Sequence, residues 1–223
     1  MQPYFHSVRL DENKCKGCTN CIKRCPTEAI RVRKGRARII EERCIDCGEC
    51  IRVCPNQAKL AITDSLERLG EFRYTVALPA PSFLAQFKPE VAPEKVWGGL
   101  LTLGFDEVFE VALAAEAVSW AIREYLQSNP ERPRPLISSA CPAVVRLIQV
   151  RFPSLLGHII PIESPMEIAG RLARERVCRM TGFPGHQVGT FFITPCPAKV
   201  TEVKQPFGGI SSVDGAISMS DLY

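Results

Sequence analysis

Eight of the eleven cysteines fall between Cys15 and Cys54, where they form two copies of one motif. Each copy reads C-x2-C-x2-C-x3-C-P, and the second copy follows the first at an offset of 29 residues. The cysteines of the repeat are Cys15, Cys18, Cys21 and Cys25 in the first copy and Cys44, Cys47, Cys50 and Cys54 in the second. Thiolate sulfur is the soft ligand of iron–sulfur clusters, with four ligands to each cluster. The repeat therefore predicts two 4Fe–4S clusters.

The spacing also predicts which cysteines share a cluster. The three close cysteines of a copy wrap one cluster, and the fourth, before proline, ligates the cluster of the other copy. The expected sets are Cys15, Cys18, Cys21 and Cys54 for one cluster, and Cys44, Cys47, Cys50 and Cys25 for the other. Structural zinc sites use pairs of cysteines and lack the third thiol and the proline. Two clusters so close together indicate single-electron transfer.

Composition limits the class of protein. The chain has 223 residues, of which 46% are hydrophobic and 23% charged, as in an ordinary globular protein. No stretch approaches 18 consecutive apolar residues, so we expect no membrane span. The odd number of cysteines and an N-terminus without the apolar region of a secretory signal argue against a disulfide framework. Both features favour the reducing cytoplasm.

The charge is divided unevenly. Residues 1–60 hold 13 Lys and Arg against 7 Asp and Glu, whereas residues 61–223 hold 15 against 17. A basic surplus can bind nucleic acid, but no basic run here is interleaved with aromatic residues, so we expect no nucleic-acid partner. A cluster with four thiolates is negatively charged, and we expect the surplus to compensate it.

The remaining elements follow from periodicity. Residues 30–33 and 37–40 predict a hairpin around Lys34–Gly35. After Glu71, strands and helices alternate, which favours a mostly parallel α/β sheet. Strands are predicted at 74–78, 108–111, 135–139, 188–194 and 215–218, and helices at 94–103, 114–126, 142–152 and 164–180. Ser164 and Glu167 are expected to form a capping box around Pro165.

These patterns divide the chain into two domains. We expect an α+β ferredoxin-type domain at 1–63, a connector at 64–70, and an incomplete α/β domain at 71–223. The final residues read as a strand and one capped helical turn, which indicates a chain cut short.

Two cysteines outside the repeat follow predicted strands. Cys141 follows the strand that ends at Ser139 and precedes a helix that starts at Pro142, Cys196 follows the strand that ends at Thr194, and a proline comes directly after each cysteine. Ligands of open α/β sheets bind beyond the carboxyl ends of the strands, so we expect both thiols to face one crevice. A small core residue is the alternative, and it is the expectation for Cys178. His6, His158 and His186 have no partners at ligand spacing and are expected to be plain core or surface residues.

With these motifs, the chain resembles the FeFe-hydrogenase large-subunit family. Residues 138–143, SSACPA, resemble the first active-site motif of the family, T-S-C-C-P. Residues 194–199, TPCPAK, resemble the second, M-P-C-x-A-K. Further similarity lies at 104–108, 152–156 and 164–166, so the resemblance covers essentially the whole chain.

The resemblance implies a cofactor and roles for three residues. In that family a 4Fe–4S cube held by four cysteines shares one of them with a two-iron unit that carries CO and cyanide. Cys141 and Cys196 would be two of these ligands, and Lys199 would be a catalytic residue that donates a hydrogen bond to a cyanide. A solvated surface charge is the alternative for Lys199. The electron partner would be a redox protein or a partner subunit.

The chain departs from the family pattern in places that matter. The third cysteine motif is absent because the chain ends first. Ala140 stands where catalytic members have a proton-relaying cysteine, and Thr194 stands where they have methionine. The acidic residues of the proton path are not clear in 118–124. These departures resemble the sensory branch of the family.

Two functions therefore stay open. One is a hydrogenase-type oxidoreductase or hydrogen sensor. The other is a ferredoxin-like electron carrier whose α/β part is only a docking scaffold.

Overall fold

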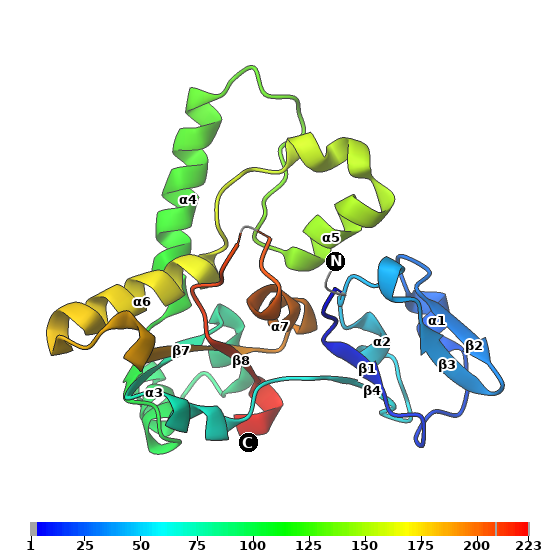
Figure 1. Ribbon diagram of the computed structural model, residues 1–223, viewed down its shortest axis with the longest axis horizontal. Helices are drawn as coiled ribbons and strands as arrows, with labels where there is room; N and C mark the ends of the chain where they lie inside the picture. Colours follow the sequence, from blue (N-terminus) through cyan, green and yellow to red (C-terminus); the bar gives the residue numbers. More distant parts are fainter. Residues whose placement is uncertain (1–3, 208, 223) are drawn as a thin grey trace.

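The computed structural model of the chain describes residues 4–207 and 209–222. A small N-terminal part with two two-stranded sheets lies beside a larger α/β part with one four-stranded sheet (Figure 1). This is the mixed α and β architecture expected from the sequence, with two small sheets in the N-terminal part and one larger sheet in the part that follows.

The backbone conformation of the N-terminal part repeats with the same 29-residue offset as the cysteines. Its elements are β1 (Val8–Leu10) paired antiparallel with β4 (Lys59–Ala61), β2 (Ile30–Arg33) paired antiparallel with β3 (Arg36–Ile39), and the helices α1 (Asn20–Arg24) and α2 (Glu49–Arg52). The predicted hairpin is therefore confirmed. Left-handed backbone at Gly17, Thr19 and Glu28 recurs 29 residues later, at Asp46, Gly48 and Gln57.

The α/β part is built on a parallel sheet of order β6-β5-β7-β8. The strands are β5 (Tyr74–Pro79), β6 (Glu107–Val108), β7 (Val188–Thr194) and β8 (Gly215–Ser218). The α-helices are α3 (Pro93–Thr102), α4 (Val111–Ser128), α5 (Pro142–Arg151), α6 (Pro165–Thr181) and α7 (Pro197–Lys204). Short 3-10 turns cover Glu41–Arg43, Leu66–Glu71, Pro81–Gln86, Pro153–His158, Gly185–Gln187 and Met219–Leu222.

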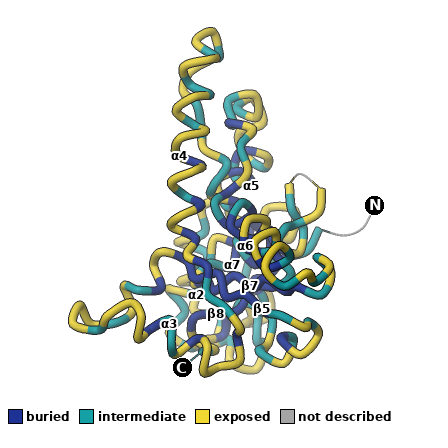
Figure 2. Tube along the Cα trace, turned by 90° about the vertical axis from the view of Figure 1, so that its left-hand side faces the viewer, coloured by how far each residue is buried: buried dark blue, intermediate teal, exposed yellow. Residues whose placement is uncertain are grey.

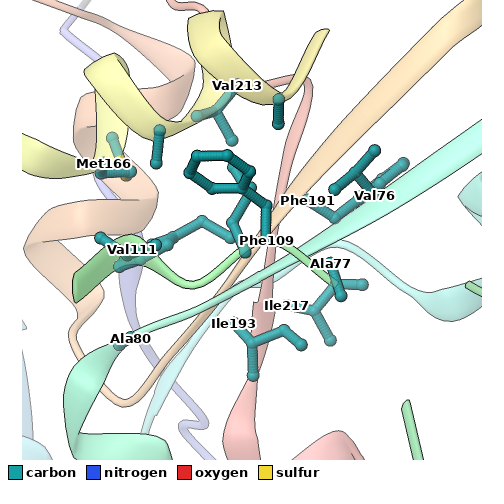
Figure 3. Close-up of a cluster of buried hydrophobic side chains, with 14 of the residues drawn as sticks. Val76, Ala77, Ala80, Phe109, Val111, Met166, Phe191, Ile193, Val213 and Ile217 are labelled. Carbon is teal, nitrogen blue, oxygen red and sulfur yellow. The ribbon is translucent and has the colours of Figure 1, made fainter. Parts of the chain in front are cut away.

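The core lies on both faces of the central strands. Val76, Phe191 and Ile217, from β5, β7 and β8, are fully buried. They pack with Val111 of α4 and Met166 of α6 in one apolar cluster (Figure 3). Strands covered on both faces read as continuous apolar runs, which is why 188–194 stood out in the sequence. By contrast, α4 extends away from this core and is largely exposed (Figure 2).

Two strand predictions were wrong in part or whole. The segment 135–139 forms no strand; it contributes one parallel bridge, between Ile137 and Ile159. Pro133 and Pro135 remove backbone donors there and prevent a regular ladder. The predicted strand at 108–111 is shorter, because α4 already begins at Val111.

The predicted capping box is also wrong. Pro165 does occupy the first turn of α6, but the Ser164 hydroxyl makes no capping hydrogen bond and has no partner among the described residues. Glu167 turns instead to the loop before β8. It accepts hydrogen bonds from the Ser211 hydroxyl at 2.8 Å and the Ser212 N–H at 2.6 Å.

Buried contacts join the two parts through α7. The Ser7 hydroxyl donates to the Pro197 carbonyl at 2.7 Å, and the Thr201 hydroxyl donates to Ser7 Oγ at 3.0 Å. Further along, the Lys204 ammonium lies 2.6 Å from Asp64, which follows β4. Ser7, directly before β1, is thus fixed against the helix that follows Cys196. Within 4–207 and 209–222, no helix is both long and apolar enough to cross a membrane.

Candidate metal centres

Four cysteines from both copies of the repeat surround one hollow of about 340 Å³. They are Cys15, Cys18, Cys21 and Cys54, and we call this space the first hollow. The close spacing of the first three is possible because Gly17 is left-handed and has no side chain. A Cβ at Gly17 would lie 2.6 Å from the Gly35 carbonyl oxygen.

The other four cysteines surround a second hollow, of about 350 Å³. They are Cys25, Cys44, Cys47 and Cys50. The structure thus brings together the two crossed sets expected from the spacing. Which metal they hold stays a prediction, but four soft sulfur donors around each space suit a 4Fe–4S cluster.

Backbone amides point at several of these sulfurs. The N–H groups of Ala29 and Ala58, at matching positions of the two copies, donate to Cys25 Sγ and Cys54 Sγ, each at 3.2 Å. The Ala37 N–H donates to Cys15 Sγ at 3.4 Å. Hydrogen bonds of this kind favour the charged thiolate over the thiol. The backbone of these loops therefore stabilises cysteine sulfurs that carry negative charge.

Burial opposes ionisation in the second set. It raises the pKa of Cys44 to about 12, with the Asp46 carboxylate adding to the rise. Burial likewise raises the pKa of Cys50 to about 12. These thiols keep their protons near neutral pH unless a metal displaces them, so metal loading must release protons.

One buried cation supports an anionic occupant of the first hollow. Lys59 lines that hollow, is 3% exposed, and its Nζ has no hydrogen-bond partner within the described residues. A buried charge without a partner is costly. A cluster with four thiolates would supply the missing negative charge. Lys59 was not among the predicted site residues, although the repeat offered a signal: the residue 29 positions earlier is the apolar Ile30.

A buried hydrogen-bonded pair flanks the second hollow. His6 Nδ1 donates to Asp46 Oδ2 at 2.8 Å, and the Val8 N–H donates to Asp46 Oδ1 at 3.1 Å. Cys44 Sγ lies 3.7 Å from Asp46 Oδ1. His6 is the core residue that we expected, but the sequence did not show that it holds the loop of the second set.

Cys196 lies close to the second hollow. It follows β7, as the sequence predicted, and it is the N-terminal capping residue of α7, a helix that the sequence analysis did not predict. It lines one groove together with Cys47 and Gly48. A Cβ at Gly48 would come within 3.1 Å of Pro197, so the second cysteine loop lies directly against the start of α7.

Cys141 occupies a different setting. It is exposed and caps the N-terminus of α5, where the helix dipole favours negative charge. It follows a loop rather than a strand, and it is not among the residues that line the groove of Cys196. α5 does pack on α7, so the two cysteines cap neighbouring helices. Cys178 lies within α6 and packs against the core, as expected.

Lys199 is not a solvated surface charge. It stands in the first turn of α7, and its side chain is only 13% exposed. Its Nζ lies 2.6 Å from Glu202 Oε2, whose side chain is 7% exposed. The surface alternative is therefore wrong, and the role of Lys199 toward a cyanide ligand stays a prediction.

Two family matches account for most of the chain. Residues 73–223 match the family described as "Iron only hydrogenase large subunit, C-terminal domain". Residues 7–55 match a "4Fe-4S dicluster domain".

Similar proteins include hydrogenases and proteins with other names. The periplasmic Fe hydrogenase large subunit of Nitratidesulfovibrio vulgaris is 29% identical over 239 residues, which cover 98% of this chain and 57% of that protein. The nuclear prelamin A recognition factor of Homo sapiens is 30% identical over 134 residues, which cover 56% of this chain and 29% of that protein. The chain thus spans 57% or less of the length of these relatives.

The solved structures agree at the level of the fold. A variant of the FeFe-hydrogenase HydA1 from Chlamydomonas reinhardtii aligns with a TM-score of 0.59 at 19% identity, over 71% of this chain and 46% of that one. The likeness shows the fold, and the match over residues 73–223 shows the family. The chain belongs to the iron-only hydrogenase large-subunit family, and residues 7–55, before the hydrogenase fold, match a 4Fe–4S dicluster domain.

Proposed function

We propose that this chain passes single electrons between a redox partner and a hydrogenase-type active-site cluster held in part by Cys141 and Cys196. The observation that carries the proposal is the shared groove of Cys47 and Cys196. Cys47 belongs to the second hollow, so an electron leaving that site has Cys196 as its near neighbour. The route would run from the first hollow through the second to α7.

Each part of the chain has a task along this route. The clusters, when bound, supply one-electron redox chemistry. The amides of Ala29, Ala37 and Ala58 stabilise the ligating sulfurs. The contact of Ser7 with Pro197 and Thr201 keeps the second cysteine loop in place beside Cys196.

The redox partner would dock at the first hollow. At matching positions of the two loops, Lys16 and Asn20 of the first are exposed, whereas Ile45 of the second is buried and Glu49 half-buried; Cys18 and Cys47 are both exposed. The first hollow is therefore the more accessible to a partner. Because basic residues are in excess in this part of the chain, an acidic redox protein or subunit suits it best. We also propose a reducing compartment, the cytoplasm, because all eleven cysteines are free thiols.

The proposal is tested in two stages. Anaerobically purified chain should contain about eight irons, four for each cluster. The chain extended by the rest of its family domain, after maturation, should show infrared bands of iron-bound CO and cyanide. Cys196→Ala and Cys141→Ala should each weaken or abolish those bands, while Cys178→Ala, the matched cysteine control in α6, should keep them. Loss of the bands in all three variants, or in none, would refute the assignment.

A second candidate is an iron–sulfur protein without hydrogen chemistry. Ala140 has no titratable atom at the position where the family resemblance implies a proton-relaying thiol. The relatives also include a human nuclear prelamin A recognition factor and a cytosolic Fe–S cluster assembly factor of Aspergillus terreus. About eight irons without CO and cyanide bands, in the extended and matured protein, would favour this candidate.

A further inference from the structure

The two hollows differ in the charges that surround them. Lys16 and Lys59 line the first hollow, and no carboxylate residue does so within the described chain. Asp46 and Glu49 line the second, and no lysine or arginine does so within the described chain. The two copies of the repeat therefore give two similar sets of four cysteines, but the charged residues that line the two hollows have opposite signs.

Two positions of the repeat account for the buried part of this contrast. Lys59 at the first hollow corresponds, 29 residues earlier, to Ile30 at the second. Asp46 at the second hollow corresponds to Gly17 at the first. Lys59 is 3% exposed and Asp46 is 2% exposed, so water screens neither charge well.

The polar contacts of these two residues reinforce the contrast. The Lys59 Nζ has no protein hydrogen-bond partner among the described residues, so nothing on the protein side offsets its charge there. The Asp46 carboxylate is held by His6 Nδ1 at 2.8 Å and by the Val8 N–H at 3.1 Å, so two polar contacts fix its position beside the second hollow. Glu49 is more exposed and is paired with Arg52 at 2.7 Å, so it contributes less.

We propose that Lys59 makes the cluster of the first hollow the better electron acceptor of the two, so that a single electron on the chain resides there. An added electron makes a cluster more negative, and a nearby buried cation stabilises that reduced form. In the internal exchange one electron leaves the second cluster, which is oxidised, and enters the first, which is reduced. The inference rests on the proposed binding of clusters by the crossed cysteine sets. The first hollow, where the redox partner would dock, then holds the electron before it moves to the second cluster.

The test measures both reduction potentials in Lys59→Met, a variant of similar size without the charge. Electron paramagnetic resonance during a redox titration of the anaerobic full chain gives the two values. We expect the equilibrium for an electron between the clusters to move toward the second cluster by about tenfold, which is ~59 mV for one electron. Lys16→Met, which removes an exposed lysine beside the same hollow, should move it by less than about threefold because solvent screens the charge.

A gain-of-charge variant identifies the cluster that moves. Ile30→Lys places a lysine at the matching position of the second hollow and should raise the potential of the second cluster. If Ile30→Lys fails to fold, the comparison of Lys59→Met with Lys16→Met still decides. Unchanged potentials in Lys59→Met, or equal shifts in both methionine variants, would overturn the inference. The iron content separates the two failures: about eight irons with unmoved potentials refutes only this inference, whereas a chain that binds no iron refutes the proposed function.

Discussion

Gly48 of the second cysteine loop lies against Pro197 at the start of α7, where an added Cβ would come within 3.1 Å of the proline ring. Gly48 also has a left-handed backbone, with φ of 76°. This contact places the second hollow beside Cys196 and leaves no free space for a side chain.

The contact predicts that Gly48→Ala loosens the packing of the N-terminal part on α7. Gly35→Ala is the matched control, since Gly35 has φ of 72° but nothing within 4 Å of an added Cβ. Both variants carry a left-handed strain of about 1–2 kcal/mol, and only Gly48→Ala adds the steric conflict. Limited proteolysis of the connector at 64–70 should therefore be faster in Gly48→Ala. Equal cleavage rates would contradict a tight contact.

Asp64 predicts a specific loss of stability in acid. Burial alone would raise its pKa, but Lys204, the Ala216 N–H and Arg68 outweigh burial and hold the pKa below the ordinary 3.8. A carboxylate with a lowered folded pKa stabilises the fold above its unfolded pKa, and that stabilisation is lost as the pH falls through the folded pKa. The melting temperature of the wild type should therefore fall more steeply between about pH 5 and pH 3 than that of Asp64→Asn.

Asp64→Asn should also cost about 1–2 kcal/mol near neutral pH, because three hydrogen bonds to a charged oxygen pair are weakened. Glu71→Gln is the control, since Glu71 binds the same Arg68 but its side chain is 53% exposed. The Glu71 variant should keep the acid transition of the wild type. An unaltered transition in Asp64→Asn would show that another group controls acid stability.

Ala140 predicts slow hydrogen turnover in the extended, matured protein. A restored thiol in Ala140→Cys should increase turnover by ~100- to 10,000-fold if general acid–base transfer is what the site lacks. Ala143→Cys, which adds a thiol in the first turn of α5, should leave the rate unchanged. If Ala140→Cys also turns over slowly, Thr194 or the unclear acidic residues of the proton path limit the rate instead.

The sequence predicted the features that have strong local signals. The crossed cysteine sets follow from spacing alone, and the buried strand at 188–194 follows from its unbroken apolar run. The segment 135–139 also has an apolar centre, but whether it pairs depends on prolines that block neighbouring donors. The strand propensity of 135–139 could not predict whether this segment pairs, because pairing also depends on the neighbouring segment.

The missed residues share a different cause. His6 and Asp46 matter through burial and through a contact between residues 40 positions apart, and Lys59 matters through its burial. A single lysine or histidine has no periodic pattern that marks it as buried. Lys59 could have been found by comparing the two copies of the repeat position by position, because that comparison exposes its mismatch with Ile30.

The central claim, two clusters on crossed cysteine sets, is tested most directly by two double variants. Cys15→Ser with Cys54→Ser removes two ligands of the first hollow, so the chain should keep one cluster with about four irons. Cys44→Ser with Cys54→Ser removes one ligand from each hollow, so both clusters should be damaged and well under four irons should remain. Iron analysis of the two anaerobically purified proteins decides. The reverse pattern, with one intact cluster in Cys44→Ser/Cys54→Ser and none in Cys15→Ser/Cys54→Ser, would mean that each copy holds its own cluster and would contradict the account.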